Sequence, residues 1–148
     1  NNPILFKNSL ILIDNGKINA LIKYREKYRP FAPAIIEEKA FKFFEVSKNY
    51  KCRYMEKVVK VRKEFTNKLS AVTHLDNSGR LQTVDKNENR DFYNILIEFE
   101  KLTGFPILLN TSFNMNGEPI VNDPMDAIKT FFNCDLHTMV IGNFLIKK

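Results

Sequence analysis

Apolar and polar positions change in short blocks along the chain, and the longest blocks predict helices. The clearest helix is expected over residues 89–103, where apolar side chains recur every three to four positions and Gly104 follows as a stop. A second helix is predicted to begin at Asp123, a favourable N-cap, with Pro124 in its first turn. A shorter helix is predicted over residues 37–45. Between these helices the pattern leaves room only for short strands.

Short apolar runs predict those strands. They cover residues 10–13, 31–36, 58–61, 106–109 and 138–146, the last interrupted by Gly142. Residues 71–75 and 80–84 are expected to form a β-hairpin, because Asn-Ser-Gly at 77–79 favours a turn. Since strands and helices alternate along the chain, the sequence predicts an α/β or α+β fold around a mixed sheet. The length of 148 residues suits one domain over residues 1–148.

The charge of the chain is concentrated in one segment. Lys and Arg number 23 against 17 Asp and Glu, which gives a net charge of +6. Residues 39–68 alone carry +7, and the remainder carries −1. Aromatic residues are interleaved with these cations, so an RNA-binding surface, a solvated face and a partner-docking surface all remain open. The favoured interpretation is a solvated or docking face, and nucleic acid is not expected as a partner.

Several classes of protein are excluded by what the sequence lacks. No apolar run approaches the roughly 18–20 residues that a membrane span needs. Cys52 and Cys134 form no zinc or disulfide pattern, which is typical of a cytoplasmic protein. P-loop and GxGxxG motifs are absent, and no metal site is expected. The first residue is Asn1 rather than Met, as expected for a processed chain or a fragment of a longer one.

Cations and polar residues form three candidate groups for anion binding. Lys23, Arg25 and Arg29 precede the rigid Pro30, and stiffly held cations suit a phosphate group. The alternative for this group is a solvated charged face.

The other two groups lie next to predicted strands. Asn110, Ser112 and Asn114 follow the apolar run 106–109, where ligands of α/β sheets collect. The alternative there is a turn whose side chains bond locally. The residues of the third group would face one another across the expected hairpin and are Thr73, His74, Arg80 and Gln82. His74 could act as a base or as a hydrogen-bond donor to phosphate, and the alternative for it is a structural residue.

Five segments of the chain resemble, in order and spacing, the C-terminal domain of the O-carbamoyltransferases of nodulation-factor and antibiotic biosynthesis. They are residues 18–26, 28–34, 71–76, 79–84 and 106–121, and the most specific are RPFAPA (29–34) and LLNTSFN (108–114) followed by NGEPIV (116–121). The resemblance implies a YrdC-like fold, a twisted mixed sheet flanked by helices.

The same resemblance implies a function. Such a domain binds carbamoyl phosphate and ATP, the latter with Mg²⁺, and forms carbamoyl adenylate, which a separate Kae1-like domain uses to carbamoylate a substrate hydroxyl. Lys23 and Arg29 match the positions that bind carbamoyl phosphate, and Ser112 and Asn114 match the SxN element of the family. Arg80 matches its arginine-bearing strand.

One stretch departs from the family. Where the family carries GPRALGNRSIL, this chain has Asn2–Leu12, with Ile4 and Ser9 in place of two arginines. A degenerate, non-catalytic subunit that docks onto a carbamoyltransferase is therefore an alternative to an active domain.

Overall fold

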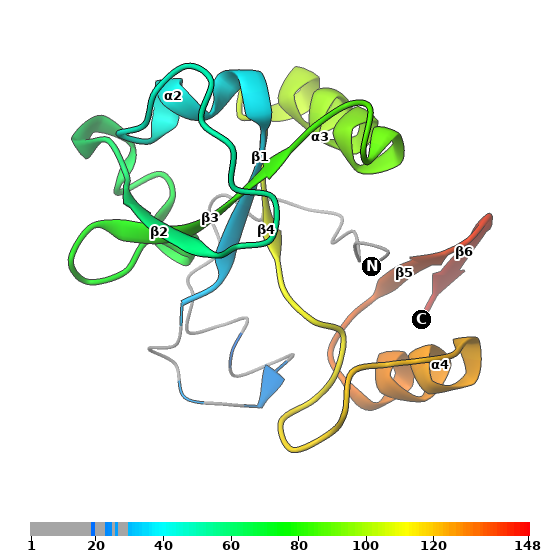
Figure 1. Cartoon of the computed structure of the whole chain (residues 1–148). Coiled ribbons are helices and arrows are strands. Elements are labelled where there is room, and N and C mark those ends of the chain that lie inside the picture. The colour runs from blue at the N-terminus through cyan, green and yellow to red at the C-terminus, as the bar shows by residue number, and fades with distance from the viewer. Residues whose placement is uncertain (1–18, 20–22, 25, 27–29) are drawn as a thin grey trace.

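The computed structural model describes residues 19, 23, 24, 26 and 30–148, and the strand expected over residues 10–13 lies outside them. Within these residues the main sheet has four strands, in the order β2-β3-β1-β4 (Figure 1). These are β1 (Ala32–Ile36), β2 (Lys57–Lys60), β3 (Ser78–Val84) and β4 (Ile107–Asn110). β1 runs parallel to β3 and antiparallel to β4, and β2 is antiparallel to β3. A mixed sheet with helices confirms the α+β class.

The helices and a second sheet complete the described part of the chain. The helical elements are η2 (Glu37–Lys39), α2 (Ala40–Phe43), η3 (Lys63–Phe65), η4 (Ser70–Val72), α3 (Arg90–Thr103) and α4 (Pro124–Asn133). The second sheet is formed by β5 (Thr138–Ile141) and β6 (Phe144–Lys147). α4 and this hairpin lie apart from the four-stranded sheet and are reached through the loop that follows β4 (Figure 1).

The central strand β1 divides the core of the main sheet into two clusters. Side chains alternate between the faces of a strand, so Ile35 enters one cluster while Ala34 and Ile36 enter the other. The Ile35 cluster includes residues of α2, η4 and the segment before β2. The Ala34 cluster includes the apolar stripe of α3, with Phe92 and Leu96. α3 therefore covers one face of the sheet.

The predicted ends of the two long helices are confirmed. The Asn89 side chain caps α3 by accepting a hydrogen bond from the Phe92 N–H at 3.2 Å. Gly104 ends α3 in the left-handed region, with φ of 79°, where only glycine avoids a steric penalty. Asp123 caps α4 by accepting from the Asp126 N–H at 2.9 Å, and Pro124 stands in the first turn. Local side-chain chemistry thus fixes where both helices begin.

The expected hairpin of residues 71–75 and 80–84 is wrong. Residues 70–72 form the short helix η4, in which Ala71 and Val72 bury their side chains in the core. The strand opposite Arg80 is β2, where Val58 is its partner. An apolar run of two or three residues fits a helical turn as well as a strand, and tertiary packing decides between them.

The single last strand predicted over residues 138–146 is also wrong. Gly142 takes a positive φ of 56° and turns the chain, so that β5 and β6 pair antiparallel. The hairpin packs on α4 around a third core, which includes Phe131 and Met139. A glycine inside an apolar run marked a reversal here rather than a local interruption.

Within the described residues, no helix is both long and apolar enough to cross a membrane.

Candidate functional site

Lys23 joins the loop after β4 through its ammonium group. Its Nζ donates to the carbonyl oxygens of Ser112 and Asn114 and to Asn114 Oδ1, each at 2.8 Å. The Lys23 residue is only 5% exposed, so the three oxygens supply the contacts that a buried ammonium requires. The structure therefore brings together three of the predicted site residues from two segments about 90 positions apart in the chain.

The loop that receives Lys23 is itself ordered by hydrogen bonds. Ser112 Oγ donates to Asn114 Oδ1 at 2.7 Å, and Asn114 Nδ2 donates to the Glu118 carbonyl at 2.8 Å. The Val121 N–H closes the loop on the Phe113 carbonyl at 3.0 Å. The loop therefore has the local hydrogen bonds that are expected of a simple turn, and in addition it binds the buried ammonium group of Lys23. The polar atoms of the loop are thus held in place before any ligand arrives.

Gln82 and Asn110 form a second polar group beside the loop. Asn110 Nδ2 donates to Gln82 Oε1 at 2.6 Å, and Gln82 Nε2 donates to the Arg53 carbonyl at 3.0 Å. The two side chains belong to β3 and β4, which lie on opposite sides of β1. They meet above Ala32 and Ala34, their partners across β1. Small side chains on β1 leave room for this bridge.

Arg80 lies on the same face as this polar group. Arg80, Gln82 and Val84 alternate onto one face of β3, and Val84 packs against α3. The apolar stripe of α3 therefore covers the Val84 end of the face, and the polar residues occupy the other end. Arg80 is exposed there, so its guanidinium is accessible to a dissolved anion.

Thr73 and His74 are held in a turn of their own. Thr73 Oγ1 donates to the Leu69 carbonyl at 2.7 Å, and the His74 N–H donates to the Ser78 carbonyl at 2.7 Å. His74 Nδ1 also lies 3.1 Å from Ser78 Oγ. The expectation that Thr73 and His74 face Arg80 and Gln82 depended on the incorrect hairpin, and the observed contacts are those of a structural turn.

Asp76, in the same turn, is expected to make a contribution to stability that is lost at low pH. Hydrogen bonds from Ser78 and Lys60 lower the pKa of Asp76 from 3.8 to about 2. Because the folded pKa lies below the unfolded one, the stabilisation is complete above about pH 4 and disappears as the pH falls toward 2. Melting temperatures between pH 5 and 2 should fall less steeply for Asp76→Asn than for the unchanged chain. Equal slopes for the two proteins would contradict this assignment.

Two predicted site residues, Arg25 and Arg29, lie outside the described residues. One residue that the sequence did not single out, Arg53, enters the site through its backbone carbonyl. Any residue type can make a contact through its backbone carbonyl, so neither composition nor spacing predicts this role for Arg53.

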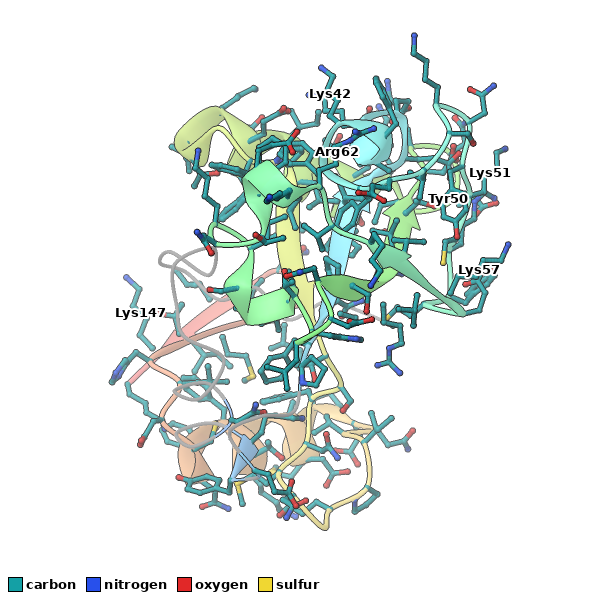
Figure 2. All side chains as sticks on the ribbon, turned by 90° about the vertical axis from the view of Figure 1, so that its left-hand side faces the viewer. Lys42, Tyr50, Lys51, Lys57, Arg62 and Lys147 are labelled. Carbon is teal, nitrogen blue, oxygen red and sulfur yellow. The ribbon has the colours of Figure 1, made fainter. Side chains whose placement is uncertain are left out.

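The basic segment 39–68 makes many contacts within the chain. Figure 2 shows Lys42 and Arg62 near α2 and Lys57 at the start of β2. Lys39 pairs with Glu100, Lys60 pairs with Asp76, and Arg53 pairs with Glu37, Asp85 and Glu88. Lys48, Lys57 and Lys68 lie over the aromatic rings of Phe41, Tyr50 and Phe105. These contacts show that the segment helps to stabilise the fold.

The RNA-binding alternative for this segment remains a prediction, which a measurement of RNA affinity at several salt concentrations would test.

Comparison with known proteins identifies the family. A family model described as the carbamoyltransferase C-terminus matches residues 12–148. Nodulation protein NolNO of Sinorhizobium fredii is 50% identical over 99% of this chain, and nodulation protein NolO of Bradyrhizobium diazoefficiens is 48% identical over 99%. Nodulation protein U of Rhizobium tropici is 41% identical over 72% of the chain.

The chain spans 22% of the length of NolNO, 28% of NolO and 18% of nodulation protein U. The family match nevertheless extends over most of the chain and includes the strand and loop residues that form the polar site. The chain belongs to the carbamoyltransferase C-terminus family.

Proposed function

We propose that this chain binds carbamoyl phosphate and ATP and activates the carbamoyl group as carbamoyl adenylate, with pyrophosphate leaving. Membership of the family supports a carbamoyltransferase-related role. The single observation that carries the finer proposal is the ordered loop of Ser112 and Asn114, fixed on the buried ammonium of Lys23. A preformed polar loop at the end of β4 is where an α/β sheet binds a small polar ligand.

The residues around this loop suit both ligands. Phosphate and triphosphate groups need fixed positive charge and hydrogen-bond donors, and the exposed guanidinium of Arg80 can supply both. Lys23 contributes its charge to the local field while its donors hold the loop. ATP is expected to bring Mg²⁺ bound to its phosphates. Clustered positive charge would also stabilise the charge that develops as pyrophosphate departs.

Transfer to an acceptor requires more than this chain in the proposed scheme. The relatives extend well beyond the region that this chain covers. We assign the transfer of the carbamoyl group to a substrate hydroxyl to a Kae1-like domain or subunit, which acts with this chain in the cytoplasm.

Calorimetry with carbamoyl phosphate and a non-hydrolysable ATP analogue tests the binding proposal. Dissociation constants in the micromolar to millimolar range are expected, and Arg80→Met should weaken binding of the nucleotide about tenfold through loss of a charge-assisted contact. Arg90→Met, which removes the same charge from an exposed residue at the start of α3, is the matched control. No binding of either ligand at millimolar concentration would overturn the proposal.

A second assay separates an active domain from a degenerate subunit. The altered stretch Asn2–Leu12 motivates that alternative. Release of pyrophosphate from ATP that depends on carbamoyl phosphate is expected for an active domain. Binding without such release would favour a docking subunit.

A further inference from the structure

A relay of hydrogen bonds with a fixed direction runs from the backbone at Arg53 to Asn110. The Arg53 carbonyl oxygen can only accept, so the Gln82 group that faces it must be the donor Nε2. The other end of the Gln82 amide, Oε1, then faces Asn110 as an acceptor. Asn110 therefore donates through Nδ2, which lies 2.6 Å from Gln82 Oε1. One backbone carbonyl therefore determines the orientation of both side-chain amides.

The relay decides which atom Asn110 has left to offer. The oxygen and nitrogen of an amide point in different directions, so Oδ1 of Asn110 is turned away from Gln82. We propose that Gln82 is a positioning residue that presents Asn110 Oδ1 to a hydrogen-bond donor on the ligand, either the N–H of a carbamoyl group or a ribose O–H. This inference rests on the proposed function, because the donor belongs to one of the two proposed ligands.

The first link of the relay is held firmly. The Thr83 N–H donates to the Cys52 carbonyl at 2.7 Å, and the Cys52 N–H donates back to Thr83 Oγ1 at 3.0 Å. The guanidinium of Arg53 is anchored by Glu37, with Nε 3.5 Å from Oε2, and by Glu88. These contacts fasten residues 52–53 along β3, so the Arg53 carbonyl is a fixed reference point for Gln82.

The strand between the two amides leaves space for them. Neighbouring strands lie about 4.8 Å apart, so β3 and β4 are roughly 10 Å apart across β1. Gln82 lies opposite Ala34 and Asn110 opposite Ala32, and both alanines are almost fully buried. A larger side chain at either position would project into the bridge. The alanines are consistent with a site in which this contact must form.

The fixed orientation has a chemical consequence for selectivity. Phosphate oxygens are acceptors and would be repelled by Oδ1, whereas an amide N–H or a hydroxyl is attracted to it. An acceptor that loses its donor on binding is destabilised, so a ligand that lacks the donor is expected to bind about tenfold or more weakly. Asn110 thus distinguishes ligands by the presence of a donor rather than by charge.

Matched ligand pairs test this selectivity by calorimetry. Acetyl phosphate replaces the NH₂ of carbamoyl phosphate by CH₃, and 2′-deoxy and 3′-deoxy ATP each lack one ribose hydroxyl. The unchanged chain is expected to prefer the donor-bearing member of one pair by about tenfold or more. The pair that shows the preference identifies the group that Asn110 contacts. No preference in any pair, with carbamoyl phosphate and ATP both bound, would overturn the inference and leave the proposed function standing.

Two substitutions of Gln82 separate positioning from simple support of the fold. In Gln82→Met the Asn110 amide is free to rotate, and the preference should fall to within about twofold. In Gln82→Glu the bond to the Arg53 carbonyl is lost, but either carboxylate oxygen can only accept and therefore still faces the donor Nδ2 of Asn110, so the preference should be retained even if phosphate affinity falls through repulsion. An unchanged preference in Gln82→Met, or its loss in both variants, would contradict the assigned role. If the unchanged chain binds no ligand, both the inference and the proposed function fail.

A measurement on the unchanged chain covers the case in which Gln82→Met does not fold. The side-chain amide protons of Asn110 should resonate as hydrogen-bonded groups without ligand and keep their shifts when carbamoyl phosphate binds. A large shift, or a scalar coupling from these protons to phosphorus, would show that Nδ2 faces the ligand and would overturn the inference.

Discussion

Replacing Lys23 by methionine should weaken the binding of carbamoyl phosphate by at least about 30-fold. The change removes the donor that the Ser112 and Asn114 carbonyls each now have at 2.8 Å, while Asn114 Oδ1 keeps the Ser112 hydroxyl as a donor at 2.7 Å. Each of the two stranded carbonyls costs about 1 kcal/mol or more, and a total near 2 kcal/mol corresponds to a factor of about 30 when the loop must be re-formed for binding. Loss of the buried charge weakens the attraction for phosphate further. Calorimetry measures the effect directly.

The control for this experiment is Lys147→Met. Lys147 is an exposed cation on β6, so the same change of charge is made outside the loop (Figure 2). This variant should bind carbamoyl phosphate within about twofold of the unchanged chain, because an exposed charge is screened by solvent and salt. If Lys23→Met bound equally well, the loop would not be the ligand site.

Replacing Phe44 by alanine should lower the free energy of unfolding by about 3–5 kcal/mol. The ring of Phe44 is completely buried and belongs to the cluster on the Ile35 face of the sheet. Its backbone also bridges to Val61, next to β2, so a cavity forms where α2 meets the sheet. Urea denaturation followed by circular dichroism measures the loss.

Tyr54→Ala provides the comparison for Phe44→Ala. Tyr54 is 82% exposed, so removing its ring creates no cavity, and its effect should stay within about 0.5 kcal/mol. Similar losses for the two variants would show that the Phe44 cluster contributes little to stability.

The sequence predicted the elements whose signals are local. The cap at Asp123 and the stop at Gly104 are predicted from side-chain chemistry within a few residues, and the structure confirms them. The hairpin at residues 71–84 failed because the true partners of β3 are β1 and β2, which no turn beside it specifies. Pairing between distant strands depends on packing that local patterns do not encode.

The candidate site was predicted in pieces. Lys23 and the pair Ser112 and Asn114 were recognised by residue type but assigned to separate groups, because about 90 residues separate them. Gln82 and Asn110 were likewise placed in different groups, and the order of the strands around β1 brings them together. The residue types of the site could be predicted from the sequence, but which of these residues meet in space depends on the topology of the sheet.

The order of the strands also governs when this chain can fold. All five residues of β1 are buried in the finished sheet, but its partners are completed only at Val84 and Asn110. A ribosome that adds 5–20 residues per second needs about 4–15 s to make the chain from the end of β1 to the end of β4. Until Val84 is made β1 has neither of its neighbours, and until Asn110 is made it still lacks β4. The emerging chain must therefore shield this fully buried strand, and a chaperone that binds extended apolar segments would find one at residues 32–36.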